Sequence, residues 1–121
     1  ILGPGFLTCA NTGTEERNVC HFTHTSGADV VVVISKDMIG GYGLLTLAGT
    51  EKSVQTRNSD TFYAFRAQLA AFVDYLETGS RPFPFSETEE LIRMVVAGTK
   101  SRQLGGRPVR ITDLEPMTEA V

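Results

Sequence analysis

The stretch Arg17–Ser35, RNVCHFTHTSGADVVVVIS, decides the fold of the first half of the chain. Its first part alternates between two faces of a strand, with Val19, His21 and Thr23 on one and Cys20, Phe22 and His24 on the other. Ser26-Gly27 is a turn signal, and a second apolar run follows it directly. The stretch therefore predicts a β-hairpin.

The second run is apolar at five successive positions, from Val30 to Ile34. Such a strand requires cover on both of its faces. Further strands are predicted on either side of the hairpin, at residues 6–9, 44–49, 52–57 and 107–111. We therefore expect an open, mainly antiparallel sheet.

The second half of the chain changes to helical periodicity. Large apolar residues fall on one helical stripe, at Phe62, Phe65, Leu69, Phe72, Val73 and Leu76. Ser59 or Asp60 is suited to cap the start of this helix, and Gly79 to end it. A second helix is predicted over residues 87–102. The fold class is therefore α+β, with two long helices packed on one face of the sheet.

Two helices cover one face only, so the other face is expected to meet another subunit or another domain. We predict a homo-oligomer that forms through this open sheet face. The chain begins with Ile1 rather than methionine, which fits a trimmed or processed piece of a longer protein as well as it fits a complete gene product. Residues 1–121 are expected to form a single domain of that protein.

Composition narrows the class of protein further. The formal charge is −3, from 14 acidic and 11 basic residues, so we expect no nucleic-acid partner. No apolar run approaches the ~20 residues that span a bilayer, so we expect no membrane partner and a cytoplasmic location. Cys9 and Cys20 fit two small buried side chains in a reducing compartment, although a cross-strand disulfide is geometrically possible.

The glutamates of the stretch Gly79–Glu90, GSRPFPFSETEE, are candidates for catalytic carboxylates. Ser86 followed by Glu89 has the spacing of a helix capping box, and acidic residues in a first turn are stabilised by the helix dipole. This structural role is the stronger interpretation, so no catalytic residue is assigned. Cys20, His21 and His24 cannot converge on a metal ion, because His21 points to the opposite face of its strand.

Three residues are suited to contact a small-molecule substrate. Lys36 and Tyr42 lie where a strand meets a loop, which is a common place for ligand contacts. His24 is the third candidate, although a structural role is more common for such a histidine. No cofactor-binding or metal-binding residue is predicted. The glycines at 40, 41 and 43 precede a strand, whereas a dinucleotide-binding loop precedes a helix.

Residues from Leu47 to Ile111 resemble the end of the Gfo/Idh/MocA family of NAD(P)-dependent sugar and polyol oxidoreductases. The similar features, in order, are a Gly49-Thr50 turn, Phe65 and Phe72 in a helix, Gly79 with Pro82, the acidic helix start at Ser86-Glu87, then Ala97, Ser101 and Gly105 or Gly106 before a closing strand. The resemblance implies most of the C-terminal α/β domain of a two-domain enzyme. The N-terminal Rossmann domain, which holds NAD or NADP in that family, is absent from this chain.

The resemblance carries over no catalytic residue. The family's glycine-rich cofactor motif is missing, and Glu51-Lys52-Ser53 lacks the proline of its Glu-Lys-Pro motif. We therefore expect the chain to be the substrate-side and oligomerisation domain of an oxidoreductase, inactive by itself. The alternative is a free-standing, non-enzymatic α+β module that dimerises through its sheet and binds a small ligand or protein.

Overall fold

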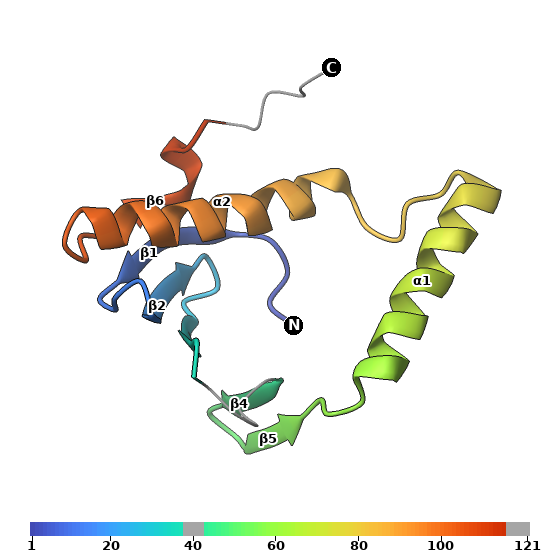
Figure 1. The fold of residues 1–121 in the computed structure, drawn as a ribbon, viewed down its shortest axis with the longest axis horizontal. Helices are drawn as coiled ribbons and strands as arrows, with labels where there is room; N and C mark the ends of the chain where they lie inside the picture. Colours follow the sequence, from blue (N-terminus) through green and yellow to red (C-terminus); the bar gives the residue numbers. More distant parts are fainter. Residues whose placement is uncertain (38–42, 116–121) are drawn as a thin grey trace. The chain divides into compact units, whose positions relative to one another are not determined.

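The computed structural model describes residues 1–37 and 43–115. Its strands are β1 (Phe6–Asn11), β2 (Arg17–His24), β3 (Asp29–Ser35), β4 (Leu44–Ala48), β5 (Ser53–Arg57) and β6 (Val109–Arg110). Its helices are α1 (Thr61–Thr78), α2 (Phe85–Gln103) and the short 3-10 helix η1 (Ile111–Asp113) (Figure 1). This mixture of two long helices and antiparallel strands confirms the α+β class. Neither long helix has the length and hydropathy that a bilayer span requires, within the residues described.

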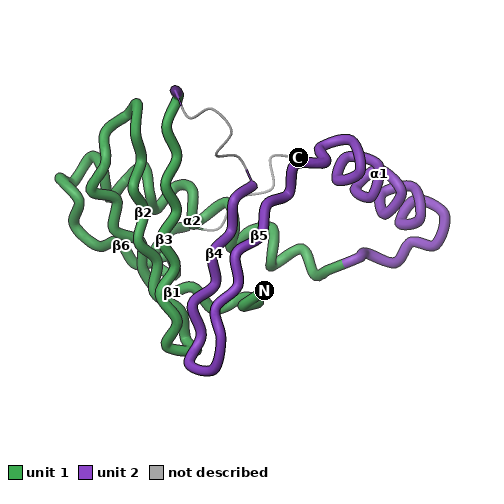
Figure 2. The backbone as a smooth tube through the Cα atoms, turned by 90° about the horizontal axis from the view of Figure 1, so that it is seen from below, with its two compact units in different colours: residues 1–36, 83–121 green, residues 37–82 purple. Residues whose placement is uncertain are grey.

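The chain divides into two compact units, which Figure 2 shows in different colours. Unit 1 contains residues 1–36 and 83–121, and unit 2 contains residues 37–82. The strands divide in the same way, into a four-stranded sheet and a separate two-stranded hairpin. The prediction of one domain concerns the longer parent protein and stays a prediction.

The sheet of unit 1 has the strand order β3-β2-β1-β6, and its strand pairs are antiparallel. The predicted β2–β3 hairpin is present, with Thr23 opposite Asp29 and Arg17 opposite Ser35. Its turn is closed by bonds from the His24 N–H to the Ala28 carbonyl and from the Gly27 N–H to the His24 carbonyl. Gly27 has φ +82°, a left-handed conformation that glycine adopts without steric cost.

Helix α2 packs on one face of this sheet, over β1 (Figure 1). The buried residues of α2 are the small ones, Ala97, Gly98 and Ser101, which let the helix backbone approach the strands closely. The apolar core between helix, sheet and η1 consists of Cys9, Phe22, Ala97, Val109, Ile111 and Leu114. The expectation that Cys20, Phe22 and His24 share the inner face of β2 agrees with its burial pattern.

A buried polar network joins α2 to the end of β1. The Asn11 side chain donates to the Asn18 side chain and to the Gly98 carbonyl, at 2.9 and 3.1 Å. It accepts from the backbone N–H groups of Gly13 and Val19 at 3.0 and 3.2 Å. The Asn11 N–H donates to Ser101 Oγ at 2.8 Å, and this hydroxyl donates to the Arg107 carbonyl at 2.7 Å. The polar groups of this network therefore have hydrogen-bond partners within the chain, as buried polar groups normally do.

The start of α2 differs from the prediction. The helix begins at Phe85 with Pro84 as its N-cap, and no side chain caps it, so the capping box of Ser86 and Glu89 is wrong. Proline fixes φ and lacks an N–H, which suits the entry to a helix. Glu90 has another structural role: its carboxylate accepts from the N–H groups of Gly5 and Phe6 at 2.7 and 2.8 Å, and so fixes the start of β1 to the helix.

Unit 2 contains the β4–β5 hairpin and α1. The hairpin is antiparallel, with Leu44 opposite Arg57 and Ala48 opposite Ser53. The predicted caps of α1 are confirmed: the Asp60 carboxylate accepts from the Tyr63 N–H at 2.8 Å, and Gly79 ends the helix with φ +70°. All residues of α1 are described, and none of them is buried.

Candidate functional site

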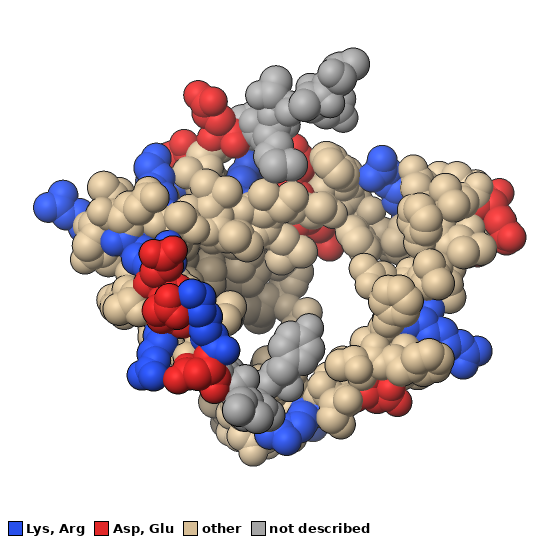
Figure 3. Space-filling view, viewed as in Figure 1, with Lys and Arg blue, Asp and Glu red and all other residues tan. Residues whose placement is uncertain are grey.

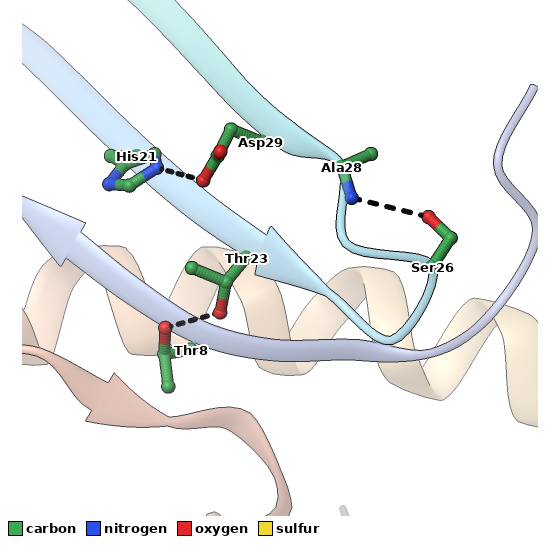
Figure 4. A network of polar contacts seen from close by, with 6 residues as sticks. All are labelled: Thr8, His21, Thr23, Ser26, Ala28 and Asp29. Carbon is green, nitrogen blue, oxygen red and sulfur yellow. Dashed lines mark hydrogen bonds and ion pairs between the residues drawn. The ribbon is translucent and has the colours of Figure 1, made fainter.

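The face of the four-stranded sheet opposite α2, called here the open face, is the candidate functional surface of unit 1. The strand register assigns side chains to it in alternation: Thr8 and Ala10 from β1, Val19, His21 and Thr23 from β2, Asp29, Val31 and Val33 from β3, and Arg110 from β6. The alternate residues point to the core under α2. Figure 4 looks onto this face, with α2 behind the strands.

One half of the open face is apolar. Val31 and Val33 stand side by side along β3 and are 62% and 52% exposed, while Val19 lies directly opposite Val33 on β2. Their neighbours Val30 and Val32 point the other way and pack against the core. A strand that is apolar on both faces therefore has one face packed and one face exposed. Exposed contiguous apolar side chains of this kind are typical of a contact surface.

The other half of the open face is polar and ordered by hydrogen bonds. His21 Nε2 lies 2.7 Å from Asp29 Oδ1, across the β2–β3 pair (Figure 4). The hydroxyls of Thr8 and Thr23 are 2.7 Å apart across the β1–β2 pair. Cross-strand pairs like these hold neighbouring strands in register. They also leave polar groups beside the valines, where a partner surface would meet both kinds of side chain.

Two of the three predicted substrate contacts are described, and the structure does not bring them together. His24 lies at the turn end of β2, whereas Lys36 follows the far end of β3. Tyr42 lies outside the described residues. The role of these residues in binding substrate stays a prediction.

His24 is buried, and both ring nitrogens have partners within the chain. The Ser26 N–H donates to Nδ1 at 3.1 Å, so the proton of the neutral ring is on Nε2, which faces the Pro4 carbonyl at 3.2 Å. The ring packs edge-on against Phe6, with centroids 4.9 Å apart. This histidine orders the hairpin turn and the residues before β1.

Lys36 is exposed, and its Nζ lies 2.6 Å from the Glu16 carboxylate. The Lys36 N–H also donates to the Glu16 carbonyl at 3.1 Å. The two residues therefore close the open end of the β2–β3 hairpin. A charged amine in this position is accessible to solvent and to a polar ligand.

Cys9 and Cys20 are both free thiols on the inner face of the sheet. Both sulfur atoms lie beneath Gly98 of α2, where an added Cβ would be 3.3 Å from Cys20 Sγ and 3.8 Å from Cys9 Sγ. Burial, followed by the proximity of Cys20, raises the pKa of Cys9 from 9.0 to about 12. Burial also raises the pKa of Cys20. A thiol whose pKa is raised is more completely protonated at neutral pH and is therefore a weaker nucleophile.

The sequence motifs do not predict the Asn11–Ser101 network or the contact between Glu90 and the start of β1. Each joins residues more than 80 positions apart. The alternation of β1 placed Asn11 on the inner face with Cys9, which was the one signal present. These residues stabilise the fold and take no part in the open face.

Among the described residues, no three His, Cys, Asp or Glu side chains are placed to hold a metal ion. On the face shown in Figure 3, the basic and acidic side chains of the described residues are intermixed. No protein-family profile, curated protein sequence or solved structure matches the chain.

Proposed function

We propose that this chain is the substrate-side and oligomerisation domain of an NAD(P)-dependent oxidoreductase acting on a sugar, a polyol or a related hydroxyl compound. The observation that carries the assembly role is the exposed valine surface of the open face, Val19, Val31 and Val33. The enzyme class is supported by the resemblance of residues 47–111 to the Gfo/Idh/MocA family. NAD or NADP belongs to the Rossmann domain of the parent enzyme.

The open face suits contact with a second copy of the same face. In a two-fold symmetric pair each valine surface covers the other, which removes apolar area from water in both chains. The free thiols Cys9 and Cys20 agree with a cytoplasmic location for the parent, because thiols stay reduced there.

Light scattering with a pair of charged substitutions tests the assembly role. Val31→Asp with Val33→Asp places two carboxylates on the valine surface, where pairing would desolvate them. We expect this variant to lose the self-association of the open face. Thr46→Asp on the β4–β5 hairpin is the control, because it adds charge at an exposed strand position elsewhere. An unchanged oligomer in the valine variant would contradict the proposal.

Amide NMR spectra of the chain test the substrate role separately. We expect millimolar polyol or sugar to shift resonances near Lys36, and Lys36→Ala to abolish the shifts. NADH and NADPH should leave the spectrum unchanged, because the cofactor domain is not part of this chain. Tight binding of either dinucleotide would contradict this division of labour. If the open face pairs but no polyol or sugar binds, the result would favour the alternative, a non-enzymatic dimerisation module.

A further inference from the structure

Helix α1 carries the largest group of exposed apolar side chains in the described chain. Its members, called here the α1 stripe, are Phe62, Phe65, Leu69, Phe72, Val73 and Leu76. Their exposed fractions range from 46% for Val73 to 77% for Phe62. A soluble helix normally buries such a stripe against a partner.

The spacing of the stripe indicates what kind of partner fits. Phe62, Leu69 and Leu76 are seven residues apart, and Phe65 and Phe72 fall between them, so the intervals run three, four, three, four. This is the a and d pattern of a helix that packs lengthwise on another helix. At 1.5 Å per residue, the 18 residues of α1 extend for about 27 Å.

Within α1 itself, the charged residues nearest the stripe lie along one of its flanks. A shallow groove there is lined by Arg66, Leu69, Ala70, Val73, Asp74 and Glu77. Arg66 lies in the first half of the helix and Glu77 near its end, on the same side as Val73. The opposite flank of the helix carries Thr61, Gln68 and Tyr75. The guanidinium of Arg81, which follows the helix, lies over the Tyr75 ring, 5.5 Å from its centroid. The charged flank is thus basic toward the N-terminus and acidic toward the C-terminus.

We propose that α1 pairs with α1 of a second copy of this chain, in antiparallel orientation. When two identical helices pack antiparallel, the same flank of each faces the other, so Arg66 of one copy meets Glu77 of its partner. In a parallel pair Arg66 would instead meet Thr61 and Gln68 on the opposite flank of the partner helix and would form no ion pair. Charge complementarity therefore selects both the partner and the direction.

The a and d positions and the charges of the flank together give the register, because a shift by one heptad would bring Arg66 beside Arg66 of the partner. In an antiparallel pair an a residue of one helix lies against a d residue of the other, so Leu69 faces Phe72 of the partner and Phe65 faces Leu76. The two-fold axis then passes between Leu69 and Phe72. In this register Arg66 and the partner's Glu77 are offset by only about two residues, or 3 Å along the axis.

The area of the stripe is close to what a stable pair requires. Six large side chains with these exposures present on the order of 600 Å² per chain, compared with about 800 Å² per partner in an interface of standard size. The α1 pair uses different residues from the open face, so each contact is testable without the other. A chain that uses both contacts assembles beyond a dimer.

Disulfide trapping between two singly substituted chains tests the register. Both chains carry Cys9→Ala and Cys20→Ala, which removes the native thiols. One chain carries Phe65→Cys and the other Leu76→Cys, and they are mixed under mild oxidation. We expect a covalent dimer in the mixture and little in either chain alone. Ala67→Cys in place of Phe65→Cys is the control, because Ala67 is on the side of α1 away from the stripe.

Three outcomes of this experiment would overturn the proposal. Dimers of the Phe65→Cys chain with itself would indicate a parallel pair. Equal trapping of the Ala67→Cys control would indicate random collision. Absence of trapping in every mixture would show that the stripe does not pair with α1 of a second copy. The Val31→Asp with Val33→Asp background separates the two contacts, since α1 trapping should persist in it even where open-face pairing is lost.

Charge reversal in the native background gives a second readout that keeps Cys9 and Cys20. Arg66→Glu places two carboxylates together, and we expect it to weaken α1 self-association about tenfold in sedimentation equilibrium. Glu77→Arg should weaken it similarly, and the double variant should restore it. Both residues are exposed on α1, so folding should be unaffected. Unchanged association in the single variants would contradict the antiparallel charge pairing.

Discussion

The two long helices differ in how their side chains are used, although they contain 18 and 19 residues. Helix α1 has the stronger apolar stripe, yet none of its residues is buried. Helix α2 buries Ala97, Gly98 and Ser101, which are small or polar. The close approach of the α2 backbone to the sheet and a hydrogen-bonded polar network hold α2 in place. Helix α1 instead exposes a row of large apolar side chains to solvent. An apolar stripe in a sequence therefore indicates a surface that needs a partner, and the partner need not belong to the same unit.

Replacement of one phenylalanine in the core under α2 and of one in the α1 stripe should show the largest difference in the free energy of unfolding between the two regions. Phe22 is 5% exposed and lies edge-on to Phe6, with centroids 6.0 Å apart, whereas Phe72 is 53% exposed. We expect Phe22→Ala to lower the free energy of unfolding by about 3–5 kcal/mol. Phe72→Ala should lower it by less than about 1 kcal/mol at a concentration low enough to dissociate the proposed α1 pair. Urea titration measures both, and equal losses would show that the α1 stripe is buried within the chain.

The buried network under α2 should be the next most sensitive part. Asn11→Ala removes four side-chain hydrogen bonds and leaves the Gly13 and Val19 N–H groups without their acceptor. We expect the free energy of unfolding to fall by about 3 kcal/mol. Gln55→Ala is the control, because its side chain makes one exposed bond to Thr46 Oγ1 and should cost under about 0.5 kcal/mol. Thermal denaturation of both variants checks the prediction, and a small effect of Asn11→Ala would mean that water replaces the network.

The sequence predicted the elements better than their partners. Alternation in residues 17–25 and the stripe after Phe62 reflect backbone geometry, so strands and helices fell where they were expected. Which strands share a sheet depends on contacts between distant segments. The sequence predicted the strands at 44–49 and 52–57, but it did not predict that β4 and β5 form a sheet of their own. The predicted β2–β3 hairpin already places His24 at its turn and Lys36 at its open end. These two residues therefore could not have been expected to form one substrate site. The Asn11–Ser101 bond joins residues 90 positions apart, and no local pattern encodes such a contact.

The close approach of α2 to the sheet should be detectable at Gly98. An alanine Cβ there would already be 3.3 Å from Cys20 Sγ, so the two further carbon atoms of valine cannot fit without displacement. We expect Gly98→Val to lower the free energy of unfolding by about 2 kcal/mol through overpacking. Ala67→Val on the exposed side of α1 should cost at most about 0.7 kcal/mol, the difference in helix propensity.

A double-mutant cycle identifies the atom responsible. Cys20→Ala removes the nearer sulfur, and we expect it to recover about 1 kcal/mol of the loss caused by Gly98→Val. Purely additive effects of Gly98→Val and Cys20→Ala would show that α2 is not in close contact with the sheet at this point.

The smallest expected effect is a decrease in the free energy of unfolding at alkaline pH. It comes from Cys9, on the face of the sheet that α2 covers. The pKa of Cys9 is about 12 in the folded chain, raised from 9.0 chiefly by burial, so the unfolded chain loses this proton first as the pH rises. The stabilisation from this group is therefore complete below pH 9 and declines as the pH rises from 9 toward 12. We expect a loss of about 1 kcal/mol between pH 8 and pH 10. Cys9→Ala should reduce that loss, while Gln55→Ala, which removes no titratable group, should leave it unchanged. Urea titrations at the two pH values measure the difference, and an identical pH dependence in Cys9→Ala would place the thiol in contact with water. The covered face of the sheet would then be as accessible as α1, and the contrast between the two helices would not hold.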